Sequence, residues 1–194
     1  MSDNNETQAN LSRKSRIATE IFEFAELVAI SLGIILLVFT FFARHSLVVG
    51  DSMIKTLENG DRLIISDLFY SPKCGDVIVC QVSDEQQRQY SQLSPKEAIV
   101  KRVIATEGQT VKIEDGRVFV DGFEIVESYK FTDGIDRKSD MEEYTVSEGC
   151  VFVMGDHRNN SLDSRYFGEI DERLVLGKVV LRVFPFSRFG SIYK

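Results

Sequence analysis

The sequence VKIEDGRVFVDGFEI, residues 111–125, decides the fold class of this chain. Its apolar and polar residues alternate with a period of two, which is typical of strands that bury one face. Two Asp-Gly pairs, Asp115-Gly116 and Asp121-Gly122, interrupt the alternation, and Asp-Gly is favoured in the type I′ turns of tight hairpins. The stretch therefore predicts a three-stranded antiparallel meander.

Short runs rich in β-branched residues continue this pattern on both sides of the meander. They are expected to form strands at 47–49, 62–65, 77–79, 99–104, 150–154 and 176–183. Helical periodicity is almost absent after residue 47, and the polar segment 83–96 is expected to be an exposed loop or one short helical turn. We predict a mainly β protein whose antiparallel core comprises 44–104 and 150–194. Residues 105–149 are expected to form a smaller appended β subdomain, charged and irregular over 123–146.

The composition excludes some classes of function. The 194 residues are 43% hydrophobic, which is enough for a sizeable core, and the formal net charge of -7 offers no basic face for nucleic acid. Three cysteines, Cys74, Cys80 and Cys150, match no metal-ligand spacing. We interpret them as buried small residues, with a Cys74–Cys80 disulfide as the open alternative. Neither a metal nor another cofactor is implied.

The N-terminal region predicts a membrane anchor. Residues 1–16 are polar and are expected to form a cytoplasmic tail, followed by one transmembrane helix over 17–43. Within that helix, Leu27–Ala43 is free of charge and long enough for about 26 Å of helix. More basic residues precede the span than follow it, which places the rest of the chain outside the cell membrane. A cleavable signal peptide is disfavoured, because the run ends without a small-x-small cleavage site.

Three stretches carry the candidate chemistry. They are GDSMIKTL at 50–57, AIVKRVI at 98–104 and MGDHRNNSLDSR at 154–165. A serine in a turn is most often structural, and a serine hydroxyl becomes a nucleophile only when a base takes its proton. Lys101 lies within an apolar run, and burial lowers the pKa of a lysine enough for it to act as that base.

These stretches, in this order behind an anchor, resemble the motifs of the bacterial type I signal peptidases. The resemblance covers about three quarters of the chain and implies a membrane-bound serine endopeptidase that cleaves signal peptides from exported preproteins, after small residues at positions -1 and -3. It implies Ser52 as the nucleophile, Lys101 as the general base and the Ser52 N–H as an oxyanion donor. Ser161 would orient the lysine. The supporting residues would be Arg102, Asp156, Asp163 and Arg165, the last two as an ion pair, and substrate would bind along Val48, Val49, Gly50, Met53 and Val100.

The sequence departs from the family pattern at three places. Lys55 stands where the family has proline, His157 where it has asparagine, and Ala105–Gln109 replaces the usual turn. Two other enzyme readings compete: a Ser-His-Asp triad through His157 and Asp163, and an S-x-x-K box through Lys55, for which no Lys-Thr-Gly follows. A non-enzymatic alternative is an anchored β module that assists the assembly of exported subunits without cutting them. The presence of both Ser52 and Lys101 argues against it.

Overall fold

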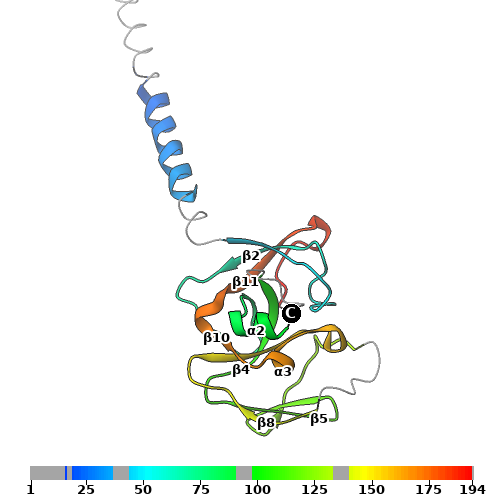
Figure 1. The fold of residues 1–194 in the computed structure, drawn as a ribbon. Helices are drawn as coiled ribbons and strands as arrows, with labels where there is room; N and C mark the ends of the chain where they lie inside the picture. The colour runs from blue at the N-terminus through cyan, green and yellow to red at the C-terminus, as the bar shows by residue number, and fades with distance from the viewer. Residues whose placement is uncertain (1–15, 17–18, 37–43, 91–97, 133–139, 194) are drawn as a thin grey trace, which may run out of the picture. The chain divides into compact units, whose positions relative to one another are not determined.

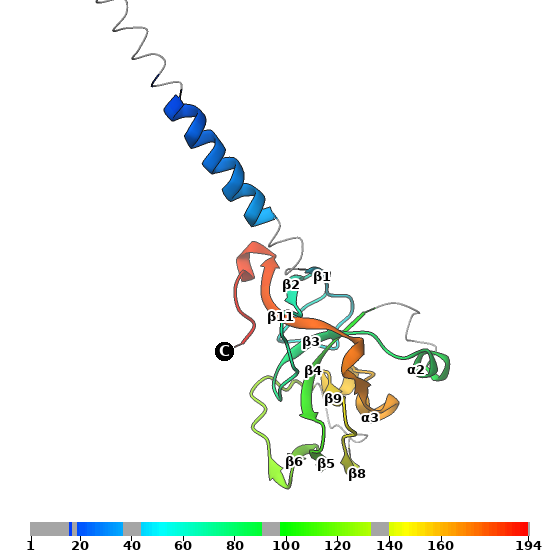
Figure 2. The ribbon, with the colours of Figure 1, turned by 90° about the vertical axis from the view of Figure 1, so that its left-hand side faces the viewer.

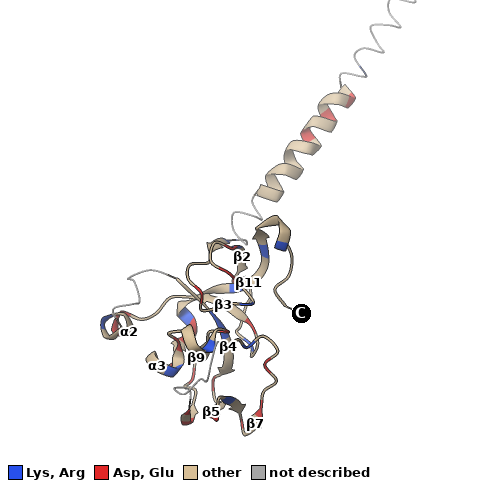
Figure 3. Ribbon diagram, turned by 90° about the vertical axis from the view of Figure 1, so that its right-hand side faces the viewer, with Lys and Arg blue, Asp and Glu red and all other residues tan. Residues whose placement is uncertain are grey.

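The computed structural model describes residues 16, 19–36, 44–90, 98–132 and 140–193, and divides into two units, 1–42 and 43–194. The first unit contains a helix over residues 19–36, with its acidic positions, Glu20, Glu23 and Glu26, in the N-terminal half (Figure 3). Within the described ranges, no helix is long and apolar enough to cross a membrane. The predicted tail, apart from Arg16, and residues 17–18 and 37–43 of the predicted anchor lie outside the described residues.

The second unit is built on a seven-stranded antiparallel sheet (Figure 1). In spatial order its strands are β1 (Arg44–Leu47), β2 (Arg62–Ser66), β11 (Val175–Phe184), β3 (Val77–Cys80), β4 (Ile99–Thr106), β9 (Cys150–Met154) and β10 (Ile170–Asp171). The predicted antiparallel β fold is therefore confirmed. The first predicted strand is displaced, because Val48 and Val49 follow β1 instead of lying within it.

A four-stranded antiparallel sheet lies at the opposite end of this unit from β1 and β2 (Figure 2). Its spatial order is β7 (Phe123–Glu124), β6 (Arg117–Val120), β5 (Thr110–Glu114) and β8 (Met141–Thr145). The predicted meander is confirmed: both residues of each Asp-Gly pair have positive φ, 51° and 70° in the first turn and 51° and 79° in the second. This backbone is the type I′ geometry that the sequence predicts. β8 was not expected, because its charged residues hide the strand pattern.

The remaining elements are short helices. They are α2 (Asp84–Gln89), η1 (Arg158–Asn160), α3 (Ser164–Phe167), η2 (Glu172–Leu174) and η3 (Phe186–Arg188). α2 confirms the short helical turn expected within 83–96. It begins at a capping box in which the side chains of Ser83 and Gln86 each bond the backbone N–H of the other.

The core beneath the large sheet fixes the turn after β1. Met53 and Leu57 are 1% and 0% exposed and pack in one cluster with Val48, Leu63 and Val79. Burial of a side chain of this size contributes about 1.5–3 kcal/mol. The apolar residues on either side of Ser52 therefore anchor the turn that carries it.

The cysteines are free thiols. Cys80 is buried in β3, Cys150 is half-buried in β9, and Cys74 is exposed with its thiol directed at the Ile104 carbonyl. The open alternative of a Cys74–Cys80 disulfide is therefore wrong. The expected burial holds for Cys80 and fails for Cys74, which lies in a connecting segment where little covers it.

Candidate active site

Ser52 lies in a tight turn whose two ends are held by the core. Before it, the backbone of Val48 pairs with Gly60 and Asp61, and after it the amide of Leu57 bonds the Met53 carbonyl. Gly50 has a φ of 86°, a conformation that favours glycine. The turn leaves Ser52 half-buried, with its hydroxyl directed towards β4.

The side chain of Lys101 meets that hydroxyl. Its Nζ lies 2.7 Å from Ser52 Oγ, and Lys101, in the almost wholly buried strand β4, is only 4% exposed. Burial lowers the pKa of Lys101 below its ordinary value, although the charge of Asp163 acts in the opposite direction. A neutral lysine accepts a proton from a serine hydroxyl, so this pair has both the distance and the electrostatics for general-base chemistry.

The polar loop after β9 contacts Ser52 through the backbone. The His157 N–H donates to the Ser52 carbonyl at 3.0 Å, and His157 Nδ1 faces the Asp51 carbonyl at 3.2 Å. Gly155 lies against the Ser52 carbonyl, since a Cβ at residue 155 would come within 2.6 Å of Ser52 O and 2.2 Å of Ser161 Oγ. Only glycine fits where the loop and the turn approach so closely.

Asp163 and Arg165 brace this loop. Arg165 donates Nε–H and Nη2–H to the two carboxylate oxygens of Asp163, at 2.8 and 2.9 Å, and Asp163 also accepts the Gly155 N–H. Burial acts to raise the pKa of Asp163, but the bonds and charge of Arg165 outweigh it and leave the pKa below its ordinary value. The geometry is the ion pair that the resemblance implies, and it fixes the path of the backbone at Gly155.

A second buried ion pair joins β4 to the loop. Arg102 donates to both carboxylate oxygens of Asp156, at 2.8 and 2.7 Å, and its Nη1 reaches the Gly75 carbonyl. Thr56 Oγ1 donates to the same carboxylate at 2.5 Å. Thr56, in the turn after Ser52, was not anticipated from the sequence, because its partner is one hundred residues away in the chain.

The predicted orienting role of Ser161 needs correction. Ser161 Oγ is buried against Gly155, and among the described residues it makes no hydrogen bond, to Lys101 or to any other group. The backbone after η1 carries the hydroxyl to the Gly155 side of the loop. Lys101 is therefore oriented by its hydrogen bond to Ser52 and by the packing around the buried strand β4.

The residues expected to bind substrate divide into two groups. Val48 and Met53 are 3% and 1% exposed, so their side chains belong to the core and the expectation that they face a substrate is wrong. Val49 and Gly50 are exposed, and Val100 is buried in β4 beside Lys101.

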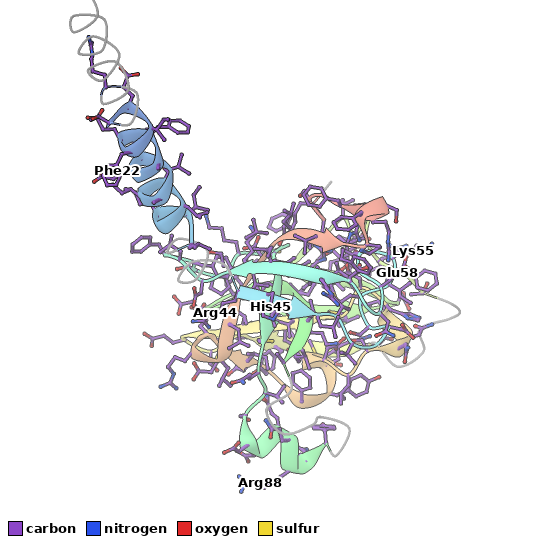
Figure 4. All side chains as sticks on the ribbon, turned by 90° about the horizontal axis from the view of Figure 1, so that it is seen from above. Phe22, Arg44, His45, Lys55, Glu58 and Arg88 are labelled. Carbon is purple, nitrogen blue, oxygen red and sulfur yellow. The ribbon has the colours of Figure 1, made fainter. Side chains whose placement is uncertain are left out.

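Neither competing enzyme site is assembled. The Asp163 carboxylate is taken up by Arg165 and Gly155, and Nδ1 of His157 faces a carbonyl where a triad requires a carboxylate. Lys55 is exposed at a margin of the unit together with Glu58 (Figure 4), and its Nζ lies over the Phe131 ring at 4.6 Å. In the described ranges no three or more His, Cys, Asp and Glu side chains gather as a metal site would require.

Comparison with known proteins places this arrangement in a family. A family model described as signal peptidase, peptidase S26, matches residues 21–184. The chain belongs to the signal peptidase family. A "Probable signal peptidase I-1" of Synechocystis sp. is 37% identical, with 89% of this chain and 87% of that protein covered. A signal peptidase I of Bacillus caldolyticus is 34% identical, with 77% and 84% covered.

Membership of the signal peptidase family confirms the resemblance inferred from the three motifs, and it makes the chain a serine endopeptidase. The roles of individual residues in this signal peptidase stay predictions. Contacts that sequence reasoning missed are the buried Glu127–Arg158 ion pair and the Tyr129 ring over Arg102. Residues 123–146 were interpreted as an irregular region, and no local pattern points from that segment to the site.

Proposed function

We propose that this signal peptidase cleaves signal peptides from exported preproteins by a Ser52–Lys101 dyad. The observation that carries the proposal is the 2.7 Å contact between Lys101 Nζ and Ser52 Oγ, made by a buried lysine whose pKa is lowered. Family membership supports the reaction class, and the relatives, which are named as signal peptidases, support the substrate class.

The reaction begins when Lys101 takes the Ser52 hydroxyl proton and Oγ attacks the scissile carbonyl carbon. The negative charge passes to the carbonyl oxygen, which would accept a hydrogen bond from the Ser52 N–H; within the described structure that N–H donates to no other group. The Lys101 ammonium then protonates the leaving amine as the peptide bond breaks. Lys101, neutral again, takes a proton from the water that attacks the acyl-enzyme carbonyl. As the ester bond breaks, the Lys101 ammonium returns that proton to Ser52 Oγ, and both residues regain their starting forms.

An extended substrate strand has a place to pair beside this dyad. β9 pairs with β4 from Arg102 to Thr106, which leaves the start of β4 without a partner on that side within the described sheet. Opposite, the Val48 backbone bonds Gly60 and Asp61, so the N–H and C=O of Val49 point the other way along an extended chain. We propose that substrate lies between Val49–Gly50 and Val100, where its main chain would add a strand.

We also propose that the enzyme works at a membrane, with the N-terminus in the cytoplasm and residues 17–43 as its anchor. The charge-free run from Leu27 to Ala43 supports the anchor. In the second unit, exposed aromatic side chains support contact with lipid. This aromatic patch comprises Phe184, Phe186 and Phe189, which are 45%, 81% and 60% exposed.

The decisive experiment is cleavage of a preprotein with alanine at positions -1 and -3 by the purified chain in detergent. The wild type is expected to cut after the -1 residue, whereas Ser52→Ala and Lys101→Met are expected to lose at least about 10³-fold in kcat/KM. A folded wild-type protein that binds the preprotein and leaves it intact would favour the non-catalytic assembly module.

A further inference from the structure

One short segment, outside the three motif stretches, contacts all of them. It is Glu127–Phe131, which follows β7 and is here named the strap. It turns at residues 128–129, where the Lys130 N–H donates to the Glu127 carbonyl at 3.2 Å, and its residues 127, 129 and 131 contact the site. Each reaches a different partner: the loop after β9, the strand that carries Lys101, and the turn that carries Ser52.

The first end of the strap is fixed by a buried ion pair. Glu127 is bonded by both terminal nitrogens of Arg158, and the two side chains are 6% and 2% exposed. Arg158 Nε also donates to the Gly155 carbonyl at 3.1 Å. Breaking a buried pair by removing one partner is costly, so this end of the strap is held in one place.

The other end is tied to the loop through the backbone. The Phe131 N–H donates to the Asp156 carbonyl at 2.8 Å, and the Phe131 carbonyl accepts the Arg158 N–H at 3.0 Å. The Phe131 ring lies 4.9 Å from the His157 ring, and the ammonium of Lys55 lies 4.6 Å from the centroid of the Phe131 ring. His157 is the residue whose N–H holds the Ser52 carbonyl, so the strap supports the loop where it meets the nucleophile.

Tyr129, in the middle, covers the guanidinium of Arg102. The edges of that planar group are bonded to Asp156 and Gly75, and the Tyr129 ring lies 3.9 Å from its central carbon. Such a contact excludes water from the face of the cation and is strongest when it is desolvated. Successive residues of a strand point to opposite faces, so Arg102 holds β4 from the side opposite Lys101.

We propose that the strap is a positioning element of the active site, in which Tyr129 acts through the Arg102–Asp156 pair to hold Lys101 and Ser52 in register. Without the ring, water reaches the guanidinium and weakens the ion pair that joins β4 to the loop. The dyad then loses its fixed geometry although each of its members is intact. This inference rests on the proposed function, because it names residues that position the same dyad.

The test compares Tyr129→Leu with Tyr129→Phe in the full chain. Leucine keeps an apolar side chain but lacks the aromatic face, whereas phenylalanine keeps the ring and loses only the hydroxyl, whose contact with Glu127 is long at 3.4 Å. Tyr144→Leu is the matched control, since Tyr144 packs on Phe152 in the same part of the fold and is absent from the site contacts described above. Melting temperature, kcat and KM for a preprotein, and the Lys101 pKa by NMR of its ε-carbon are measured for each.

We expect Tyr129→Leu to lose about tenfold or more in kcat with little change in KM, and its Lys101 pKa to rise towards the ordinary value as water enters. Tyr129→Phe should match the wild type, and Tyr144→Leu should lower the melting temperature while it keeps kcat. The proposal is overturned if Tyr129→Phe is as impaired as Tyr129→Leu, or if Tyr144→Leu loses as much kcat. A wild type that cuts no preprotein would sink the proposed function, and the strap would then be judged by the Lys101 pKa, whose constancy in Tyr129→Leu would refute it.

Discussion

The carbonyl oxygen of Ser52 accepts a hydrogen bond from the backbone N–H of His157 at 3.0 Å. The nucleophile is therefore positioned by its own main chain as well as by its side chain. A side chain at Gly155 would collide with the same Ser52 carbonyl oxygen. The hydrogen bond from His157 therefore depends on a residue without a Cβ at position 155.

Gly155→Ala is expected to impair the enzyme by moving the loop away from Ser52. The new Cβ would lie 2.2 Å from Ser161 Oγ and 2.6 Å from Ser52 O, so the backbone must shift. Overpacking of this kind costs about 1–3 kcal/mol, and a displaced nucleophile costs about 10²-fold in kcat. Gly33→Ala, with no heavy atom within 4 Å, is the control. Thermal unfolding and cleavage rates of Gly155→Ala equal to those of the control would contradict the close approach.

The pH dependence of cleavage should report the Lys101 amine. Because burial lowers its pKa, kcat/KM is expected to rise with pH, with its midpoint below the ordinary lysine value of about 10.4. The rise should follow one ionisation. A pH–rate profile that is flat from acid to alkaline pH, or that rises only at the ordinary lysine pKa, would show that Lys101 is not the base.

Lys101→Met should abolish cleavage and stabilise the fold. The unfolded chain keeps the lysine proton up to a higher pH than the folded chain does, so the wild type bears the cost of burying a charge at low pH. That cost falls as pH rises through the window between the folded and the unfolded pKa. The gain in free energy of unfolding from Lys101→Met should therefore be largest below the window and fade above it. Chemical denaturation at several pH values measures it, and a gain that grows with pH would reverse the assignment.

Asp163→Ala should destabilise the protein and lower activity together. The carboxylate is fully buried and bonds Arg165 twice, so its removal deprives a buried cation of this carboxylate and costs about 3–5 kcal/mol. Asp171→Ala is the matched control, since Asp171 pairs with Arg173 at an exposed site where such a pair is worth about 0–1 kcal/mol. If Asp163→Ala melts like the control and loses only turnover, Asp163 has a direct catalytic role instead.

Lys55→Ala should keep cleaving preproteins. Its ammonium is exposed and lies over Phe131, whereas the Lys101 amine is the one in contact with Ser52 Oγ. Loss of an exposed cation–π contact is worth about 0.5–1 kcal/mol, which corresponds to a change of at most about fivefold. Initial rates on one preprotein decide the matter: a dead Lys55→Ala beside an active Lys101→Met would refute the dyad.

The aromatic patch should bind lipid. Residues 43–194 without the first unit are expected to sediment with anionic vesicles, and Phe186→Ser should weaken that binding, because Phe186 is 81% exposed. Phe123→Ser is the control, since Phe123 is 78% exposed on β7 in the other sheet. Equal losses of binding in both variants would indicate nonspecific hydrophobic binding to the vesicles and not a docking face.

Local patterns predicted what is local. Period-two alternation and Asp-Gly turns gave the meander, and the apolar neighbours of Lys101 predicted its burial because the same residues form β4. The strap could not be predicted, since its residues matter through partners brought near only by the folded sheets. Ser161 shows the opposite failure: its type and spacing were suitable, but the backbone path placed the hydroxyl against Gly155.

The place of β11 in the large sheet has a consequence for synthesis of the enzyme. β11 follows every other strand of this sheet in sequence, yet it lies between β2 and β3 and joins β1 and β2 to the strands around Lys101. The nascent polypeptide therefore cannot complete this sheet until Val175–Phe184 has been synthesised. A chain truncated before Val175 would lack the strand that joins the two parts of the sheet.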